Sequence, residues 1–129
     1  PLALFPHGPG LDEVVAEAER FVTPMRIHTG GSSDRVPQPV VEIDGAGVEI
    51  DAVKLADLPA DTTARDLVVR LHESVGNRTR ITVRSDRRIT AASRCNLLEE
   101  PESGLEVGDG ICALTVAPFE IVTLRLTRS

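Results

Sequence analysis

A helical repeat of apolar residues stands near the start of the chain, in the stretch LDEVVAEAERFV (residues 11–22). The apolar members recur at spacings of three and four, as one face of a helix requires. They are Leu11, Val14, Val15, Ala18, Phe21 and Val22. Asp12 and Glu13 suit the positive end of the helix dipole, and Pro24 stops the helix. The pattern predicts a single helix over about 11–22.

From Val40 onward the apolar repeat shortens from 3.6 residues to two, which is typical of strands. Seven such runs follow, separated by turn-forming residues: 40–44, 48–55, 66–75, 79–84, 89–97, 111–117 and 119–127. In the third run Leu67, Val69 and Leu71 share one face. The apolar parity shifts between Ala52 and Val53, which predicts a bulge or a strand end there.

Seven short strands at this spacing predict an all-β fold, an antiparallel, immunoglobulin-like β-sandwich preceded by one short helix. The connections are expected to be GGSSDRVPQP (30–39), ADLPADTTAR (56–65) and a long polar loop from Glu99 to Gly110. That loop either reaches toward a neighbour or is a solvated connector. We expect residues 1–35 to form an N-terminal strand, the helix and a linker, and residues 36–129 to form the sandwich.

Composition excludes several classes of protein. The 129 residues carry a net charge of −6, whereas nucleic-acid binding needs a basic face. No apolar run approaches the roughly 20 residues that cross a bilayer, so we expect neither a nucleic-acid nor a membrane partner, and a cytoplasmic location. Cys95 and Cys112 are too few for a disulfide scaffold or a zinc site. We expect two reduced, buried thiols, with a cross-strand disulfide as the alternative.

The stretch FPHGPG (residues 5–10) does not match a phosphate loop, because no Lys and Ser or Thr follow its glycines and Pro9 has no N–H to donate. As a metal ligand His7 lacks partners, since His28 and His72 lie in other segments without zinc-motif spacing. The structural interpretation is that a strand end, LALF, joins the helix through a stiff turn. The Asn77-Arg78-Thr79 sequon is interpreted as a plain turn.

A glycosidase would need two carboxylates about 5 Å apart, or further apart if it inverts configuration. The candidates are Asp44, Asp51, Glu73, Glu99, Glu100, Asp109 and Glu120. Most stand at turns or alternate with apolar residues, as on a solvated face. No serine lies in a G-x-S-x-G context, and neither cysteine has an adjacent basic motif. We therefore predict no catalytic, cofactor-binding or metal-binding residue in this segment.

Sugar-binding modules usually stack an aromatic ring on a pyranose, but the sequence contains neither Trp nor Tyr. Its three aromatic residues are Phe5, Phe21 and Phe119. Phe21 lies on the helical stripe and Phe119 in an apolar run, so both are expected in the core. Sugar binding would then depend on Phe5 or on polar contacts alone.

Three runs, DLVVRLHESVGNRTRITV, RCNLLEEP and LTVAPFEIVTLRL, together resemble the C-terminal part of family 38 glycoside hydrolases, the α-mannosidases. The run VEIDAVKLAD resembles the preceding strand, and LALFPHGPG with its helix resembles the family's join to its large β-domain. The matching positions are Arg70, Glu73 and Gly76; Leu97, Leu98 and Glu99; and Pro118, Phe119, Glu120, Ile121, Thr123, Leu124 and Arg125.

The resemblance implies a non-catalytic terminal domain of a retaining α-mannosidase, which caps the preceding β-domain and braces the enzyme. It places the catalytic aspartate and a divalent metal, expected to be zinc, in a preceding domain, so no cofactor is expected in this segment. The implied partners are the upstream domains and, for the parent enzyme, an α-mannoside; surface exposed by truncation would favour self-association. The alternatives are a stand-alone carbohydrate-binding or protein-interaction module and, less favoured, an independent small hydrolase.

Overall fold

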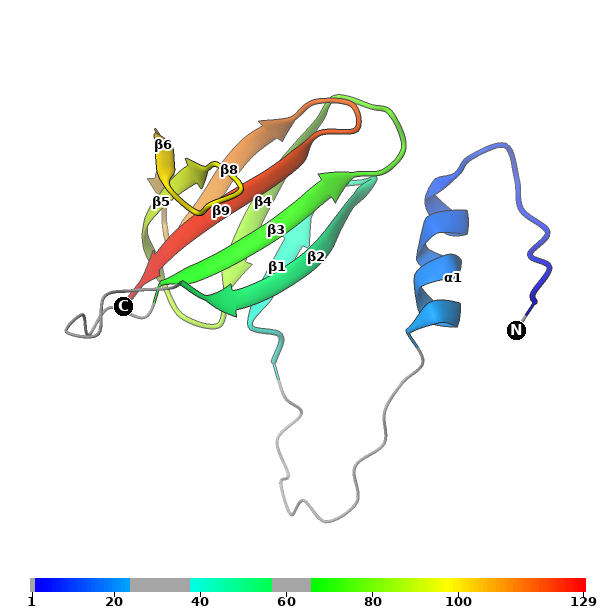
Figure 1. The fold of residues 1–129 in the computed structure, drawn as a ribbon, viewed down its shortest axis with the longest axis horizontal. Coiled ribbons are helices and arrows are strands. Elements are labelled where there is room, and N and C mark those ends of the chain that lie inside the picture. Colours follow the sequence, from blue (N-terminus) through cyan, green and yellow to red (C-terminus); the bar gives the residue numbers. More distant parts are fainter. Residues whose placement is uncertain (1, 24–37, 57–65) are drawn as a thin grey trace, which may run out of the picture. The chain divides into compact units, whose positions relative to one another are not determined.

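The computed structural model describes residues 2–23, 38–56 and 66–129. The chain divides into two compact units, Pro1–Gln38 and Pro39–Ser129. The first contains helix α1 (Asp12–Val22), and the second contains the strands (Figure 1). The expected 35/36 boundary, the linker, most of the 56–65 loop, Pro24 and His28 lie outside the described residues.

Helix α1 confirms the predicted helix to within one residue. Leu11 is its N-cap, with no capping hydrogen bond from its side chain, and the amide of Thr23 donates to the carbonyl of Glu19 at the other end (2.8 Å). Among residues 2–11, 13–23 and 38 of this unit none is buried, and Phe21, expected in a core, is exposed. The segment LALF was expected to be a strand but forms no regular structure, since a strand needs a neighbour to take up its hydrogen bonds.

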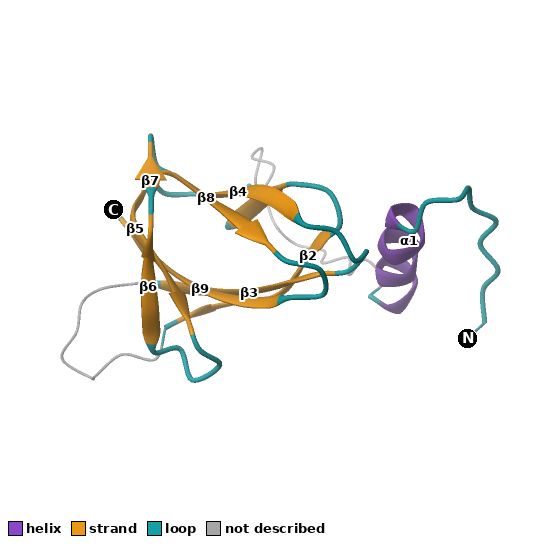
Figure 2. Cartoon of the chain, turned by 90° about the horizontal axis from the view of Figure 1, so that it is seen from above, coloured by secondary structure: helices purple, strands orange, loops and turns teal. Residues whose placement is uncertain are grey.

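Nine strands make up the described part of the second unit. They are β1 (Val41–Asp44), β2 (Val48–Leu55), β3 (Leu67–Glu73), β4 (Thr79–Ser85), β5 (Ile89–Cys95), β6 (Pro101–Leu105), β7 (Val107–Gly108), β8 (Ile111–Val116) and β9 (Ile121–Arg128). One sheet has the order β1-β4-β8-β7 and the other β2-β3-β9-β5-β6, and all neighbours are antiparallel. Figure 2 shows the sheets as two layers. The predicted antiparallel sandwich is confirmed.

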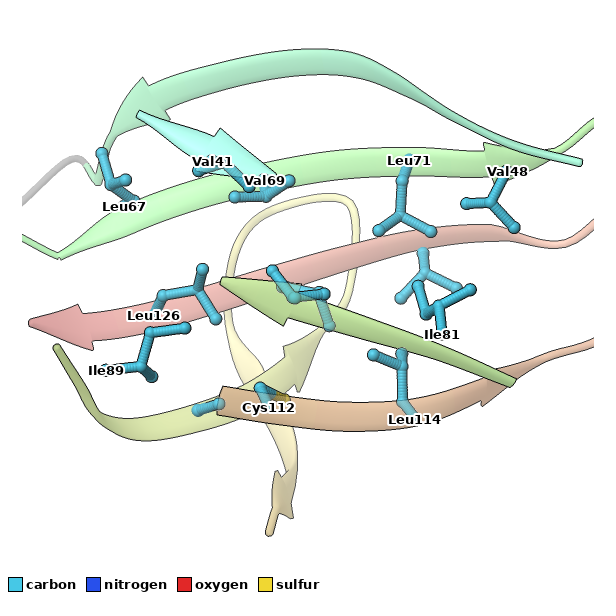
Figure 3. Close-up of a cluster of buried hydrophobic side chains, with 14 of the residues drawn as sticks. Val41, Val48, Leu67, Val69, Leu71, Ile81, Ile89, Cys112, Leu114 and Leu126 are labelled. Carbon is cyan, nitrogen blue, oxygen red and sulfur yellow. The ribbon is translucent and has the colours of Figure 1, made fainter. Parts of the chain in front are cut away.

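The core lies between the layers and consists mainly of the alternate, inward-facing positions along the strands of both sheets (Figure 3). Leu67, Val69 and Leu71 of β3 share the face that the sequence predicted. Leu71 pairs with Val122 and Val69 with Leu124 of β9, so the two central strands present matched apolar rows. Cys112 also belongs to this core, which explains its complete burial.

Two predictions about the strands were wrong in detail. The polar loop from Glu99 to Gly110 contains β6 and β7, because an edge strand pairs through its backbone and needs no apolar alternation. The irregularity in β2 lies between Ile50 and Ala52 rather than after Ala52, so Asp51 is the residue without a register partner. A single unpaired residue there shifts the side-chain alternation, which is the signal that the sequence carried.

Candidate functional site

The most elaborate polar arrangement in the sandwich is centred on Glu73, the last residue of β3. Its Oε1 accepts hydrogen bonds from the amides of Val75 (3.1 Å) and Asn77 (3.0 Å). Its Oε2 accepts from the amides of Gly76 (2.7 Å) and Phe119 (2.9 Å). One carboxylate thereby joins the β3–β4 turn to the β8–β9 turn, 46 residues further along the chain.

Glu73 is 1% exposed, so it is an exception to the solvated face expected for most of the candidate carboxylates. Burial opposes its ionisation, but the four amides outweigh burial and lower its pKa from 4.5 to about 2. Such a carboxylate stays ionised at neutral pH, and each of its oxygens already accepts two hydrogen bonds from backbone amides. It is therefore suited to holding turns and unsuited to donating a proton.

The β1–β2 turn joins the same assembly through Gly47. Its carbonyl accepts hydrogen bonds from the amide (2.8 Å) and the hydroxyl (3.2 Å) of Ser74. Gly47 has φ +71°, and a Cβ built there would lie 2.2 Å from Cγ2 of Val75 and 3.3 Å from Oε1 of Glu73. Glycine is required at this position for both its conformation and its space. Three turns thus pack around one carboxylate.

A second carboxylate, that of Glu120, also stabilises the β8–β9 turn. Its Oε2 accepts from the amide of Ala117 (2.7 Å), and Nη1 of Arg94 donates to Oε1 (2.7 Å). Nη2 of Arg94 donates to the carbonyl of Thr115 (2.5 Å). Burial opposes ionisation of Glu120, but the Ala117 amide, Arg94 and the charge of Arg78 together lower its pKa.

The loop between β5 and β6 is closed by Asn96. Its Oδ1 accepts from the amides of Leu98 (2.9 Å) and Glu100 (3.1 Å), and its Nδ2 donates to Oε2 of Glu100 (2.7 Å). The backbone amide of Asn96 donates to the carbonyl of Glu100 (3.0 Å), and Glu99 adopts φ +67°. These bonds fix the loop in one compact turn.

This loop lies against the outer face of the five-stranded sheet. Nζ of Lys54 in β2 is 2.7 Å from Oε1 of Glu99. In β3, Nη2 of Arg70 donates to the carbonyl of Leu97 (3.4 Å), and its Nε donates to Oγ1 of Thr123 in β9 (3.4 Å). These contacts connect the loop to β2 and β3 and, because Arg70 also binds Thr123, indirectly to β9.

Four large apolar side chains, in the Asn96 loop, in the β8–β9 turn and at the start of β9, are exposed. Phe119 is 71% exposed, Ile121 62%, Leu97 68% and Leu98 80%. The expectation that Phe119 belonged to the core was wrong: it lies in the β8–β9 turn with φ +58°, ahead of the first residue of β9. Its ring packs on Gly76, where an added Cβ would come within 2.8 Å of Cζ.

The candidate metal ligands do not assemble into a site. Nδ1 of His7 is 2.6 Å from the carbonyl oxygen of Gly8, and Nδ1 of His72 is 2.9 Å from Oδ1 of Asp51. In residues 2–23, 38–56 and 66–129 there is no group of three or more His, Cys, Asp or Glu side chains that could hold a metal ion. Within the same ranges, no helix has the length and apolarity to span a bilayer.

The remaining candidates are dispersed. Asp44 is exposed in β1, and Glu100 is bound to Asn96. Asp109 lines a surface hollow of about 470 Å³ whose other charged residues are Arg84, Arg87 and Arg88. Cys95 and Cys112 are free and buried, as expected, and burial raises the pKa of Cys112, which disfavours the reactive thiolate.

The sequence contained a pattern that places Glu73 on the inner face of β3, although a carboxylate is ordinarily expected to face solvent. Leu67, Val69, Leu71 and Glu73 have the same parity along β3, and the first three are core residues. A carboxylate that continues an inward-facing row into a glycine turn is placed to accept the amides of that turn. No comparable pattern marked Phe119, because its exposure depends on the turn rather than on strand alternation.

Fold and site together define an antiparallel β-sandwich domain in which the carboxylates of Glu73 and Glu120 accept hydrogen bonds from the domain's own turns. Residues 47–124 match the family model described as the glycosyl hydrolases family 38 C-terminal beta sandwich domain. The chain therefore belongs to this family, and the resemblance identified in the sequence is confirmed. A search of curated proteins found no match to the chain.

Proposed function

We propose that this chain is a non-catalytic structural domain of a retaining α-mannosidase that hydrolyses terminal α-mannosides. The observation that carries the proposal is the match of residues 47–124 to a C-terminal β-sandwich domain of glycosyl hydrolase family 38. The domain's role is to pack against the upstream domains of the same chain and to stabilise them.

The chemistry of the described carboxylates supports this role. A retaining glycosidase needs one carboxylate free to attack and one carboxylic acid with a raised pKa to protonate the leaving group. Glu73 and Glu120 instead have lowered pKa values, and both accept hydrogen bonds from backbone amides. The described residues also do not fit a divalent metal. We place the catalytic aspartate and its metal, expected to be zinc, in another domain.

The complete polypeptide that contains this chain tests the activity directly. We expect it to hydrolyse an aryl α-mannoside with retention of the anomeric configuration, as followed by NMR. Deleting residues 39–129 is expected to lower its melting temperature and its yield of active enzyme. A complete polypeptide without α-mannosidase activity would contradict the proposed activity.

Point variants in the complete polypeptide test the non-catalytic role. Asp51→Asn, Glu99→Gln and Glu120→Gln each remove one candidate charge while nearly preserving shape. Loss of a general acid or base typically costs roughly 10²–10⁴-fold in rate, whereas we expect kcat changes of less than about threefold. A loss of two orders of magnitude for any variant that remains folded would identify a catalytic contribution from this domain.

The exposed ring of Phe119 favours one alternative, a carbohydrate-binding module. An aromatic face accessible to solvent can stack on a pyranose, which the sequence had allowed only for Phe5. Titration of the 129-residue chain with mannose, observed by NMR, separates the two functions. Saturable shifts at Phe119 that Phe119→Ala abolishes would support the module, and unchanged spectra would support the structural role.

A further inference from the structure

We propose that a surface hollow at one end of the four-stranded sheet binds the phosphate group of a small phosphorylated molecule. The hollow has a volume of about 470 Å³ and is lined by three arginine side chains, those of Arg84, Arg87 and Arg88. We name it the arginine hollow. The proposal is independent of the α-mannosidase activity, because it concerns only residues of the sandwich.

The pairing of β4 with β8 brings the two sides of the arginine hollow together. The antiparallel register runs from Thr79 with Val116 to Val83 with Cys112, so the end of β4 and the start of β8 lie at the same end of the sheet. One side of the hollow comes from the end of β4 and the β4–β5 turn, and the other comes from the turn between β7 and β8. The site therefore depends on two turns that are distant in the sequence.

The backbone on both sides of the arginine hollow is fixed by contacts within the domain. In the β7–β8 turn, Asp109 and Gly110 have φ +53° and +79°, the left-handed conformations of a tight hairpin turn. The carbonyl of Arg88 accepts a hydrogen bond from the amide of Ser129 (3.0 Å). The stem of the Arg88 side chain passes over Gly110, where an added Cβ would lie 2.9 Å from its Cγ. Glycine at position 110 thus allows Arg88 to lie against the opposite turn.

The acidic residue of the β4–β5 turn, Asp86, is already bound by groups other than the arginines of the hollow. Its Oδ1 lies 2.6 Å from Nη1 of Arg128 and 2.9 Å from the hydroxyl oxygen of Ser85. The hydrogen bond with Ser85, together with Arg128 and the charge of Arg87, outweighs burial and lowers the pKa of Asp86. Asp86 is therefore ionised at neutral pH and paired with Arg128.

The arginine side chains of the hollow have no acidic partner of this kind. Within residues 2–23, 38–56 and 66–129, the side chains of Arg84, Arg87 and Arg88 make no hydrogen bond or ion pair. Glu42 of β1 lies opposite Arg84 in the register but is not joined to it by an ion pair. Asp109 is the one acid of the lining, so three positive groups and one negative group give a net charge of +2. Including Glu42 leaves +1, whereas the whole chain carries −6.

A phosphate monoester has the charge and the acceptors that this lining requires. Guanidinium groups donate pairs of parallel hydrogen bonds to phosphate oxygens. A phosphate monoester carries a charge of about −1.5 to −2 at pH 7, which matches the lining. The volume of the hollow lies within the range of about 300–1,000 Å³ that is typical of sites for small molecules. A nucleic acid would need a longer basic face than these three residues provide.

The surroundings also provide space for the rest of a phosphorylated molecule. A second hollow, of about 430 Å³, shares Arg88, Asp109 and Gly110 with the first. A carboxylate repels phosphate but accepts hydrogen bonds from hydroxyl groups. Asp109 is therefore placed to bind hydroxyl groups of the molecule that carries the phosphate.

NMR titration of the 129-residue chain at constant ionic strength tests the proposal. The probes are inorganic phosphate, glycerol 3-phosphate and, as the uncharged control, glycerol. We expect saturable shifts of the Gly110 amide and of the Nε–H groups of Arg87 and Arg88 with both phosphates. We expect no shift of these signals with glycerol at the same concentrations.

Charge-removing variants locate the binding. Arg87→Gln and Arg88→Gln should each weaken phosphate binding by at least about fivefold, because each removes charge-assisted hydrogen bonds. Arg80→Gln is the matched control: Arg80 is exposed on β4 but does not line the hollow, and its replacement should change the affinity by less than about twofold. Asp109→Asn should tighten the binding of inorganic phosphate, because asparagine suits the same turn and no longer repels the anion. The melting temperature of each variant verifies that it folds.

Shifts that increase linearly with phosphate and do not saturate would overturn the proposal. Equal weakening by Arg80→Gln and Arg87→Gln would also overturn it, because the attraction would then come from diffuse surface charge rather than from the hollow. Weaker binding of inorganic phosphate by Asp109→Asn would contradict the placement of the anion beside Asp109.

Discussion

Replacing Gly47 with alanine should destabilise the sandwich more than its small size suggests. The left-handed conformation at φ +71° costs a non-glycine residue about 1–2 kcal/mol. The new Cβ would also overlap Cγ2 of Val75 at 2.2 Å, with Oε1 of Glu73 behind it at 3.3 Å. Overpacking of this kind costs about 1–3 kcal/mol. We expect the free energy of unfolding to fall by about 3 kcal/mol in total.

Equilibrium unfolding of the 129-residue chain in urea, followed by circular dichroism, measures this loss. Gly104→Ala is the matched control, because a Cβ at Gly104 in β6 meets no atom within 4 Å and its φ is not positive. The control should change the free energy of unfolding by less than about 0.5 kcal/mol. If Gly47→Ala were as mild as Gly104→Ala, the three turns could not be packed around Glu73 as described.

The remaining predictions concern the carboxylate, the core, the thiols and the helical unit. Because the pKa of Glu73 is about 2 in the fold and near 4.5 when unfolded, its contribution is complete above pH 4.5 and is lost as the pH falls from 4.5 toward 2; Glu73→Gln should flatten that part of a urea-unfolding pH profile, and an unchanged profile would refute the assignment. Leu124→Ala, at a fully buried position of β9, should cost about 2–5 kcal/mol in the same assay, and a cost below 1 kcal/mol would place Leu124 outside the core. The buried thiols of Cys95 and Cys112 should react with a thiol reagent only at the rate of unfolding, and immediate reaction in native buffer would contradict their burial. The exposed apolar residues of the unit Pro1–Gln38, Leu2 and Leu4 among them, should make the chain self-associate, whereas a monodisperse monomer in light scattering at high concentration would rule this out.

Alternation along the sequence was sufficient to predict the sandwich and the faces of its central strands. Leu67, Val69 and Leu71 are inward because a strand that packs on one face must repeat with period two. The same rule assigns Glu73 to the inner face, yet a carboxylate is ordinarily taken as solvated. Its burial is explained only by the positions of four amides, three in the β3–β4 turn and one, that of Phe119, in the distant β8–β9 turn.

Features that depend on contacts distant in the sequence could not be predicted in this way. Strands β6 and β7 form because β5 and β8 offer backbone partners, and their own sequence is that of a polar loop. The exposure of Phe119 follows from a turn fixed by Glu73 and Glu120, which lie 47 residues apart in the sequence but meet where the amide of Glu73 donates to the carbonyl of Glu120 (3.0 Å). Local pattern predicts the strands, whereas the site depends on how the turns between them meet.

The central claim is that this domain supports a glycosidase without supplying its catalytic groups. The most direct test compares hydrolysis of an aryl α-mannoside by the purified 129-residue chain and by the complete polypeptide, at equal molar concentration and with added Zn²⁺. We predict turnover by the complete polypeptide and none above the uncatalysed rate by the 129-residue chain. Hydrolysis by the 129-residue chain that Glu120→Gln or Glu99→Gln abolishes would contradict the claim.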